Sequence, residues 1–287
     1  MSTTTPKSRY LDVLKDIEDF YTENAVEVWC PTSGISLKFK PLSVSQLKKF
    51  IELQVAAEKD EFGVLPGLRV VKKLNDVLAD NCLEKSADIF ESVTILDRDA
   101  VIVQLRANVK SEADVVVDGE TEVVDLHEVV KKIKKVKFDK KLRSRTKSYK
   151  FGESTLKLNL RLPSLNVDNT LNGYFANKVR PKLQKGKKHV EKDVEKILSQ
   201  VFFIEMSKYI ESVVVSKDTT ETVISFDQAS TLDDSLAFLE KLPSKLLSEV
   251  SGYATDIKAY RDSTISYTSS EDKDIPLDID VALFAGI

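Results

Sequence analysis

The charged residues of this 287-residue chain are segregated along the sequence, and this layout constrains its fold more than any short motif does. Between Lys131 and Lys192, 20 Lys and Arg residues stand against 4 Asp and Glu residues, a net charge of +16. Since the whole chain has a net charge of −3, the remainder carries −19. A folded chain with segregated charge usually presents one face to a polyanion or to an acidic partner. We therefore expect the basic middle of the chain to form a binding surface.

The composition is that of a globular protein, with 42% hydrophobic and 31% charged residues. No apolar run approaches the roughly 20 residues that span a bilayer, and the start lacks the apolar core of a secretory signal. We expect the protein to stay in the cytoplasm where it is made, without membrane contact. Cys30 and Cys82 have no CxxC partner. They are expected to be small buried hydrophobes in a reducing compartment, the alternatives being a disulfide or a nucleophile.

Four segments are predicted, which could also form one composite domain. Residues 1–25 contain an amphipathic helix whose apolar positions recur at helical spacing. It could pack on its own domain or dock on a partner. These positions are Leu11, Leu14, Ile17, Phe20 and Tyr21.

Residues 26–110 are predicted to form a hairpin followed by helices. Alternating apolar residues at 26–40 flank the turn cluster Pro31–Gly34. Ser43 and Gln46 have the spacing of a capping box at the start of a helix. Further helices are expected after Pro66-Gly67, at 87–93, and at 98–105 with Asp97 as the cap.

Residues 111–167 are predicted to be a β-rich insert with segregated charge. Asp118-Gly119 indicates a two-residue hairpin at about 113–124, and the stretch from Ser111 to Val130 carries seven carboxylates and no Lys or Arg. A second hairpin is expected at about 147–162. Its solvent face would carry Lys150, Lys157 and Arg161.

Residues 168–287 are predicted to be mainly helical and to end in a strand. An apolar stripe from Val190 to Ile210 predicts one long helix, and two helices broken at Pro243 follow it. The tail 275–287 alternates, with Leu277, Ile279, Val281 and Leu283 on one face. A tail this apolar is expected to be ordered as a strand, either against its own sheet or against the exposed edge of a partner. The predicted fold class is therefore α+β: a mainly helical core with hairpins at about 26–40, 113–124 and 147–162.

The candidate partner-binding residues are the cations at the start of the basic region: Lys131, Lys132, Lys134, Lys135, Lys137, Lys140, Lys141, Arg143 and Arg145. Three interpretations stay open: contact with acidic protein, an ordinary solvated face, and nucleic acid. Phe138 and Tyr149 alone give little aromatic stacking. The two histidines, His127 and His189, lack ligand neighbours, so no metal is expected. Nucleotide and hydrolase motifs are absent from the sequence, so neither a cofactor nor catalytic residues are predicted.

Three segments together resemble the baseplate hub assembly proteins of T4-like contractile-tailed phages. They are VEVWCPTSGISLKFKPLSVSQLKKFIEL, ILDRDAVIVQLRANVKSEADVVV, and FDQASTLDDSLAFLEKLPSKLLSEVSGY together with the ending IPLDIDVALF. The first is similar to a strand leading into a Lys- and Leu-rich helix. The second is similar to a helix ending in Leu-Arg before a β-segment, and the third to a helix-Leu-Pro-helix element with a closing strand.

The resemblance implies a non-enzymatic protein that binds other hub or tail proteins, as a structural subunit or as an assembly chaperone. It would act in the host cytoplasm during assembly, or remain in the tail baseplate of the virion, and Phe284 in the closing strand is a further candidate contact. A nucleic-acid-binding protein that uses residues 131–192 is the alternative, and an enzyme with a cryptic site is a third hypothesis. The isoelectric point of 5.7 favours assembly over nucleic acid.

Overall fold

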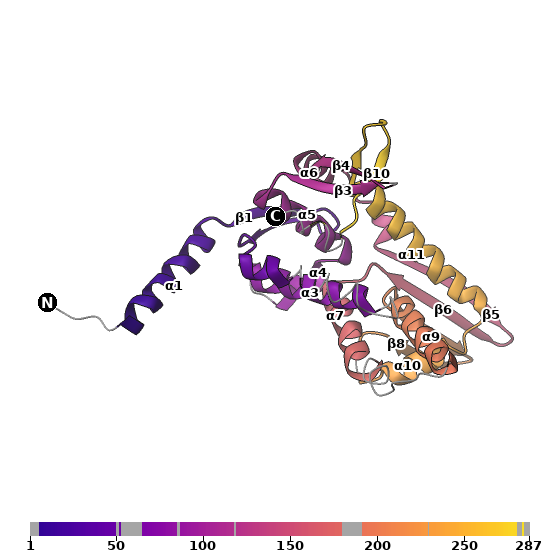
Figure 1. Cartoon of the computed structure of the whole chain (residues 1–287). Helices are drawn as coiled ribbons and strands as arrows, with labels where there is room; N and C mark the ends of the chain where they lie inside the picture. Colours follow the sequence, from indigo (N-terminus) through magenta and orange to yellow (C-terminus); the bar gives the residue numbers. More distant parts are fainter. Residues whose placement is uncertain are drawn as a thin grey trace. The chain divides into compact units, whose positions relative to one another are not determined.

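A computed structural model of the chain describes residues 6–49, 52, 65–84, 87–117, 119–179, 191–228, 230–279 and 283. Helices and antiparallel strands share the chain, which confirms the predicted α+β class (Figure 1). The chain divides into two compact units: Met1–Ile89, Asp97–Val136 and Ile265–Ile287 form the first, and Phe90–Leu96 and Lys137–Thr264 form the second. This division passes through the predicted segment 111–167. None of the helices formed by the described residues is long and apolar enough to cross a membrane.

The first unit combines helices with three two-stranded ladders. Its elements are α1 (Pro6–Glu23), β1 (Val26–Cys30), β2 (Ile35–Phe39), α3 (Leu65–Asn81), α5 (Ile95–Val109, from Asp97 onward), β3 (Glu112–Val117), β4 (Glu120–Asp125), α6 (Leu126–Lys135), β9 (Ser266–Thr268) and β10 (Asp274–Pro276). α4 (Ala87–Ser92) lies at the boundary between the two units.

The β1–β2 hairpin confirms the prediction at 26–40, and Gly34 in its turn has a φ of 69° that favours glycine. The prediction that Asp97 caps a helix is wrong, because α5 already begins at Ile95. The fully buried Asp97 carboxylate instead accepts hydrogen bonds from the Thr32 N–H (2.8 Å), the Thr32 hydroxyl (2.6 Å) and the Ser33 hydroxyl (2.5 Å). Asp97 thus fixes the hairpin turn from a distant helix.

The predicted capping box is also present. The Ser43 N–H donates to Gln46 Oε1 at 2.9 Å, the Gln46 N–H donates to Ser43 Oγ at 3.3 Å, and residues 44–49 are helical. In α3, Leu74, Val77 and Leu78 are buried, as their helical spacing predicts.

The β3–β4 hairpin confirms the prediction at 113–124. Val117 pairs with Glu120, so the connection has two residues, and Gly119 has a φ of 89°. α6 follows directly, with the Asp125 side chain accepting the His127 N–H at its start. Its apolar stripe of Leu126, Val129 and Ile133 is buried.

Arg106 on α5 is the largest fully buried side chain of the described residues. Its Nε donates to the backbone carbonyl of Leu283 at 2.7 Å, its Nη1 to that of Lys110 at 2.5 Å, and its Nη2 to that of Glu112 at 3.0 Å. Burial lowers the pKa of Arg106, and the charge of Asp114 opposes this shift. One guanidinium therefore joins the end of α5, the start of β3 and the C-terminal tail.

The prediction of a strand over residues 275–287 is wrong for most of the residues that the structure describes in this range, which are 275–279 and 283. The strand is β10, Asp274–Pro276, and residues 277–279 are not in a strand. The burial prediction is confirmed for Leu277 and Leu283. Leu283 is helical rather than extended, and its carbonyl accepts a hydrogen bond from the Arg106 side chain. Residues 280–282 and 284–287, with Phe284 among them, lie outside the described residues.

The second unit is built on one four-stranded antiparallel sheet in the order β5-β6-β7-β8. Its strands are β5 (Ser144–Phe151), β6 (Ser154–Arg161), β7 (Ile210–Lys217) and β8 (Thr220–Ser225). Its helical elements are the 3₁₀ turn η1 (Lys140–Leu142), α7 (Leu165–Tyr174), the π-helix η2 (Phe175–Val179), α9 (Glu191–Ser207), α10 (Leu232–Leu239) and α11 (Ser244–Thr264).

Side chains alternate across β6, so Leu156, Leu158 and Leu160 share one buried face. α11 packs against this strand, and its own buried residues include Val250 and Tyr253. The hairpin predicted at 147–162 is confirmed, and it begins three residues earlier, at Ser144.

The prediction of a mainly helical segment after residue 168 is wrong for residues 210–225. The predicted long helix ends at Ser207, and Ile210 begins β7 instead of closing the helix. β7 and β8 form a hairpin in which Asp218 has a φ of 53°. The apolar stripe of α9 continues into the β-branched residues Val213–Val215. The apolar spacing of the sequence therefore does not show that the helix ends before Ile210.

The hydrogen bonds of Arg106 yield a stability prediction. Arg106→Met removes three charge-assisted hydrogen bonds from a buried site, so we expect a loss of about 3–5 kcal/mol in the free energy of unfolding. Urea unfolding followed by circular dichroism measures it. Lys134→Met on the exposed face of α6 is the control, expected to stay within about 0.5 kcal/mol of the wild type. An Arg106→Met variant as stable as the wild type would contradict the assignment.

Candidate functional site

The nine predicted cations do not fall on one unit. The division after Val136 places Lys131, Lys132, Lys134 and Lys135 on α6 of the first unit. The other five, Lys137, Lys140, Lys141, Arg143 and Arg145, belong to the second. The basic run is therefore divided between the two units.

On α6, two of the four lysines already have acidic partners. The Lys131 ammonium lies 2.6 Å from Glu128, one helical turn earlier, and this hydrogen bond raises the pKa of Lys131. Lys132 contacts Asp274 at 2.9 Å and the Ser266 hydroxyl at 2.5 Å, and this ammonium lowers the pKa of Asp274. Lys134 and Lys135 are exposed.

In the second unit, Arg145 is held by α11. Its guanidinium lies 2.7 Å from Asp256 and 5.1 Å from the centre of the Tyr253 ring, an arrangement of ion pair and cation–π contact. On the same strand, Lys147 lies 3.9 Å from Glu249. Lys137, Lys140, Lys141 and Arg143 are exposed. Arg145 thus serves the packing of α11 on the sheet.

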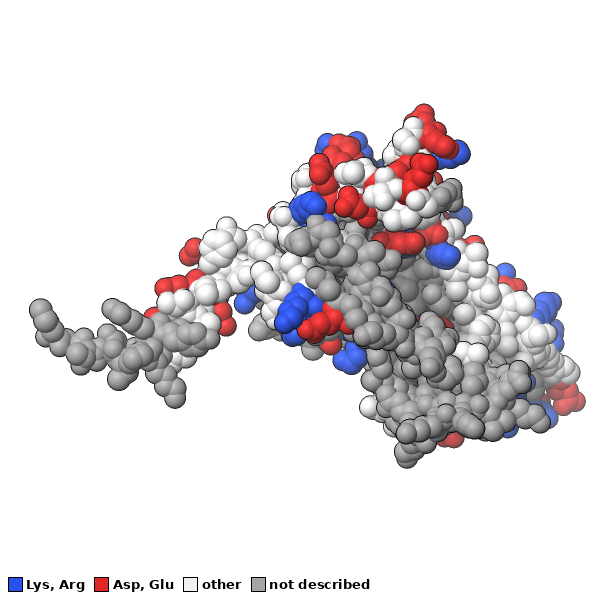
Figure 2. All heavy atoms as spheres, viewed as in Figure 1, with Lys and Arg blue, Asp and Glu red and all other residues white. Residues whose placement is uncertain are grey.

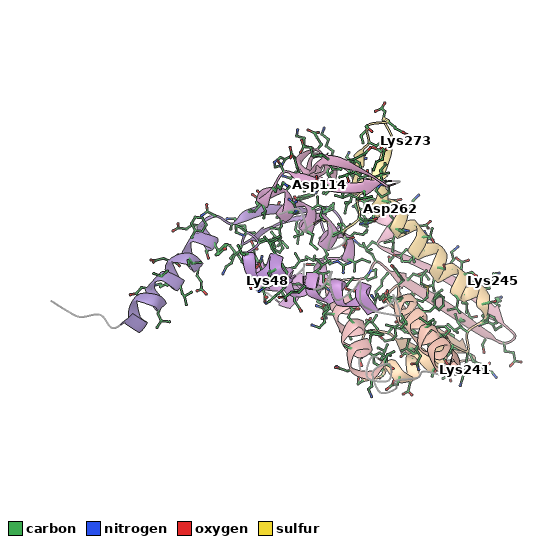
Figure 3. The ribbon with its side chains drawn as sticks, in the orientation of Figure 1. Lys48, Asp114, Lys241, Lys245, Asp262 and Lys273 are labelled. Atoms are coloured by element: carbon green, nitrogen blue, oxygen red, sulfur yellow. The ribbon has the colours of Figure 1, made fainter. Side chains whose placement is uncertain are left out.

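The predicted solvent face of the second hairpin is present in part. Lys150 and Lys157 are exposed. Arg161 instead has only 13% of its side chain exposed and forms an ion pair with Asp227. On the other side of the sheet, Lys245 of α11 lies 5.7 Å from the centre of the Tyr149 ring, and Figure 3 marks its place on that helix.

A hollow of about 980 Å³ in the first unit is a surface feature that sequence reasoning missed, and we call it the β4 groove. Every residue of β4 lines it, from Glu120 to Asp125. Residues 266–270, which include β9, form a second border. α6 contributes Glu128, Val129, Lys131, Lys132 and Lys135, and Val136 follows at the C-cap of this helix. The signal for it in the sequence is the acidic stretch from Ser111 to Val130.

Four carboxylates and three lysines line this groove, and the carboxylates are Glu120, Glu122, Asp125 and Glu128. Figure 2 shows carboxylates gathered over the β3–β4 hairpin and at the tip of the β9–β10 hairpin, and Figure 3 marks Asp114 and Lys273 on these hairpins. The Ser270 hydroxyl donates to Glu122 at 2.9 Å. Burial and the nearby Glu122 charge raise the pKa of Tyr267 in the same groove.

α1 presents a second surface. All residues from Leu11 to Phe20 are exposed, including five large apolar side chains. Leu11 is 60% exposed, Leu14 40%, Ile17 46% and Phe20 60%. The sequence leaves open whether this helix packs on its own domain or docks on a partner. In this structure its apolar stripe is not packed on its own domain.

Buried charged side chains in the second unit connect two of its helices. Lys208 lies 2.9 Å from Asp168 and 3.0 Å from Glu205, with 7% and 2% of the Lys208 and Asp168 side chains exposed. Burial alone would lower the pKa of Lys208, but the two carboxylates reverse this and raise it. The pair joins α7 to the end of α9.

The described residues contain no group of three or more His, Cys, Asp or Glu side chains that could hold a metal ion. His127 is exposed at the start of α6, and His189 lies outside the described residues. Cys30 and Cys82 are buried free thiols, as expected. Burial raises the pKa of both, in Cys82 to about 11, so neither is activated as a nucleophile.

Comparisons with models of known protein families, with curated proteins and with solved structures found no match for this chain.

The thiol environments generate a prediction. At pH 8, the native protein should react with Ellman's reagent over hours or longer, because each thiol is buried and its raised pKa leaves little thiolate. In 8 M urea, both thiols should react within minutes. Absorbance at 412 nm measures both rates. A native thiol that reacts as fast as it does in urea would show an accessible, activated cysteine.

Proposed function

We propose that this protein is a non-enzymatic assembly factor of a phage tail, which binds other baseplate hub or tail proteins as a subunit or as a chaperone. The sequence resemblance supplies the tail context. The observation that carries a binding role is α1, whose apolar stripe is exposed. Monomeric proteins seldom expose a continuous apolar surface unless it meets a partner.

The chemistry of α1 indicates what kind of partner it fits. Leu14, Ile17 and Tyr21 follow one another at intervals of three and four residues, the pattern of a helix that docks in an apolar groove. The polar side of α1 carries Asp12, Asp16, Glu18, Asp19 and Glu23 against Lys15. An apolar groove with a basic rim on another tail protein complements both sides of the helix.

The interaction can be tested by co-expressing the protein with hub and tail proteins encoded beside it and measuring co-elution and affinity. Leu14→Asp and Ile17→Asp should each weaken the complex by about 2 kcal/mol, roughly 30-fold, because each places a charge in an apolar contact. The control, Lys15→Asp, adds one carboxylate on the side of α1 away from Leu14, Ile17 and Tyr21. It should stay within about threefold of the wild type.

Two outcomes would overturn this role for α1. One is a complex that tolerates Leu14→Asp and Ile17→Asp as well as it tolerates the control. The other is dimerisation of the wild type in light scattering that the same two substitutions abolish, because the stripe would then be covered by a second copy.

The nucleic-acid alternative makes a different prediction. With Lys131, Lys132 and Arg145 already paired to carboxylates, we expect only weak binding to random duplex or single-stranded DNA. Anisotropy of labelled DNA between 50 and 200 mM salt measures it. Submicromolar binding with a steep salt slope that Lys134→Gln with Lys135→Gln reduces would favour the alternative.

A further inference from the structure

We propose that β4 is a docking edge for an extended, Lys- or Arg-rich segment of a partner protein, which adds to the β3–β4 sheet as a third strand. This surface is separate from α1, and the proposal does not depend on the phage assignment. It rests on the backbone pattern of β4, on the β4 groove beside it and on the charge of the hairpin.

The register of the hairpin determines which backbone groups of β4 face the groove. In an antiparallel pair, residues that exchange hydrogen bonds alternate with residues that do not. The two-residue turn makes Val117 and Glu120 an exchanging pair. The same alternation predicts that Ser111 and Leu126 are also an exchanging pair. The Leu126 N–H does donate to the Ser111 carbonyl, at 2.8 Å. Thr121 and Val123 therefore direct their N–H and C=O groups away from β3.

No other strand of the described residues occupies this edge. The β3–β4 ladder has two strands, and all six residues of β4 but none of β3 line the β4 groove. The groove thus runs along a row of backbone donors and acceptors. An extended peptide can take these up, as in strand addition to an exposed sheet edge.

On the opposite border of the groove, β9 also directs backbone groups away from its paired strand. Around β9, the Ser269 N–H donates to Lys273 at 2.8 Å and the Leu277 N–H donates to Ile265 at 2.9 Å. By the same alternation, Ser266 and Thr268 turn their backbone groups away from β10. Both residues line the groove, and no residue of β10 does. Polar main chain therefore borders the groove on two sides.

Charge selects the occupant. The described residues of the hairpin include five carboxylates and no Lys or Arg: Glu112, Asp114, Glu120, Glu122 and Asp125. Pairing β4 with β4 of a second copy would place like charges on neighbouring strands, which is unfavourable. Two of the three groove lysines are already paired, Lys131 with Glu128 and Lys132 with Asp274. A basic segment is the strand that complements this edge.

Apolar contact adds to this complementarity. Val116 is 70% exposed and Val123 is 64% exposed on the outer face of the hairpin. Their registers, Val116 with Thr121 and Val123 with Asp114, place both on that face. A partner strand that alternates cationic and β-branched side chains can cover Val123 and reach the carboxylates.

The test uses the full-length protein and a fluorescein-labelled ten-residue peptide of alternating Lys and Val, with a Glu-Val peptide as the charge control. Fluorescence anisotropy in 50 mM salt should show binding of the Lys-Val peptide at least tenfold tighter than that of the Glu-Val peptide. Hydrogen exchange measured by mass spectrometry should show slower exchange in residues 120–125 when the Lys-Val peptide is bound.

A pair of proline variants separates the two edges of the hairpin. Val123→Pro removes an N–H that faces the groove and leaves the β3–β4 ladder intact, so affinity should fall at least tenfold. Val116→Pro makes the same change at the β3 edge and should leave affinity within twofold. Circular dichroism checks that both fold. Glu120→Lys provides a second variant without proline, and it should reduce the preference for the Lys-Val peptide at least fivefold.

The proposal is overturned by any of three results: no binding of the Lys-Val peptide at 1 mM, equal affinity for the two peptides, or protection confined to segments other than 120–125. Equal loss with Val123→Pro and Val116→Pro would also overturn it. The α1 variants should leave peptide binding unchanged, so failure here is distinguishable from failure of the proposed function.

Discussion

The buried guanidinium of Arg106 is the interaction on which the first unit most depends. A charge removed from water is costly unless its donors are satisfied. Here three backbone carbonyls accept them, from Lys110, Glu112 and Leu283. The first two carbonyls belong to neighbouring residues at the end of α5 and the start of β3, and the third belongs to the tail, 177 residues after Arg106. The position of the acidic hairpin therefore depends on one cation that makes no surface contact.

An open strand edge is usually protected by lysines, prolines or irregular pairing. The β3–β4 hairpin is protected by carboxylates instead, and these repel a second copy while they attract a cationic strand. The same residues therefore prevent self-association and select a partner. α6 supports this arrangement because two of its three lysines in the groove lining, Lys131 and Lys132, are paired with Glu128 and Asp274.

Alternating apolar residues, turn residues and capping residues predict the local elements that they form. Contacts between residues distant in sequence determine the features that sequence reasoning misses. The hairpins at 26–40, 113–124 and 147–162 follow from alternation and turn residues, as does the Ser43–Gln46 capping box. Sequence reasoning misses the β7–β8 hairpin because Val213–Val215 continues an apolar stripe that fits a helix or a strand. The cations are evident as a run, but Asp274, the partner of Lys132, and Asp256, the partner of Arg145, lie more than 100 residues away, so no spacing rule could show these two pairs.

The two surfaces bind by different physics, which determines how each would behave in an assembly. α1 offers apolar side chains, whose burial depends little on salt. The β4 groove offers backbone hydrogen bonds and carboxylates, so its attraction for a cationic strand weakens as salt screens the charges. A chain with both can hold one partner through a helix and recognise another through a strand. Because no described residue of α1 lines the groove, occupation of one surface need not block the other.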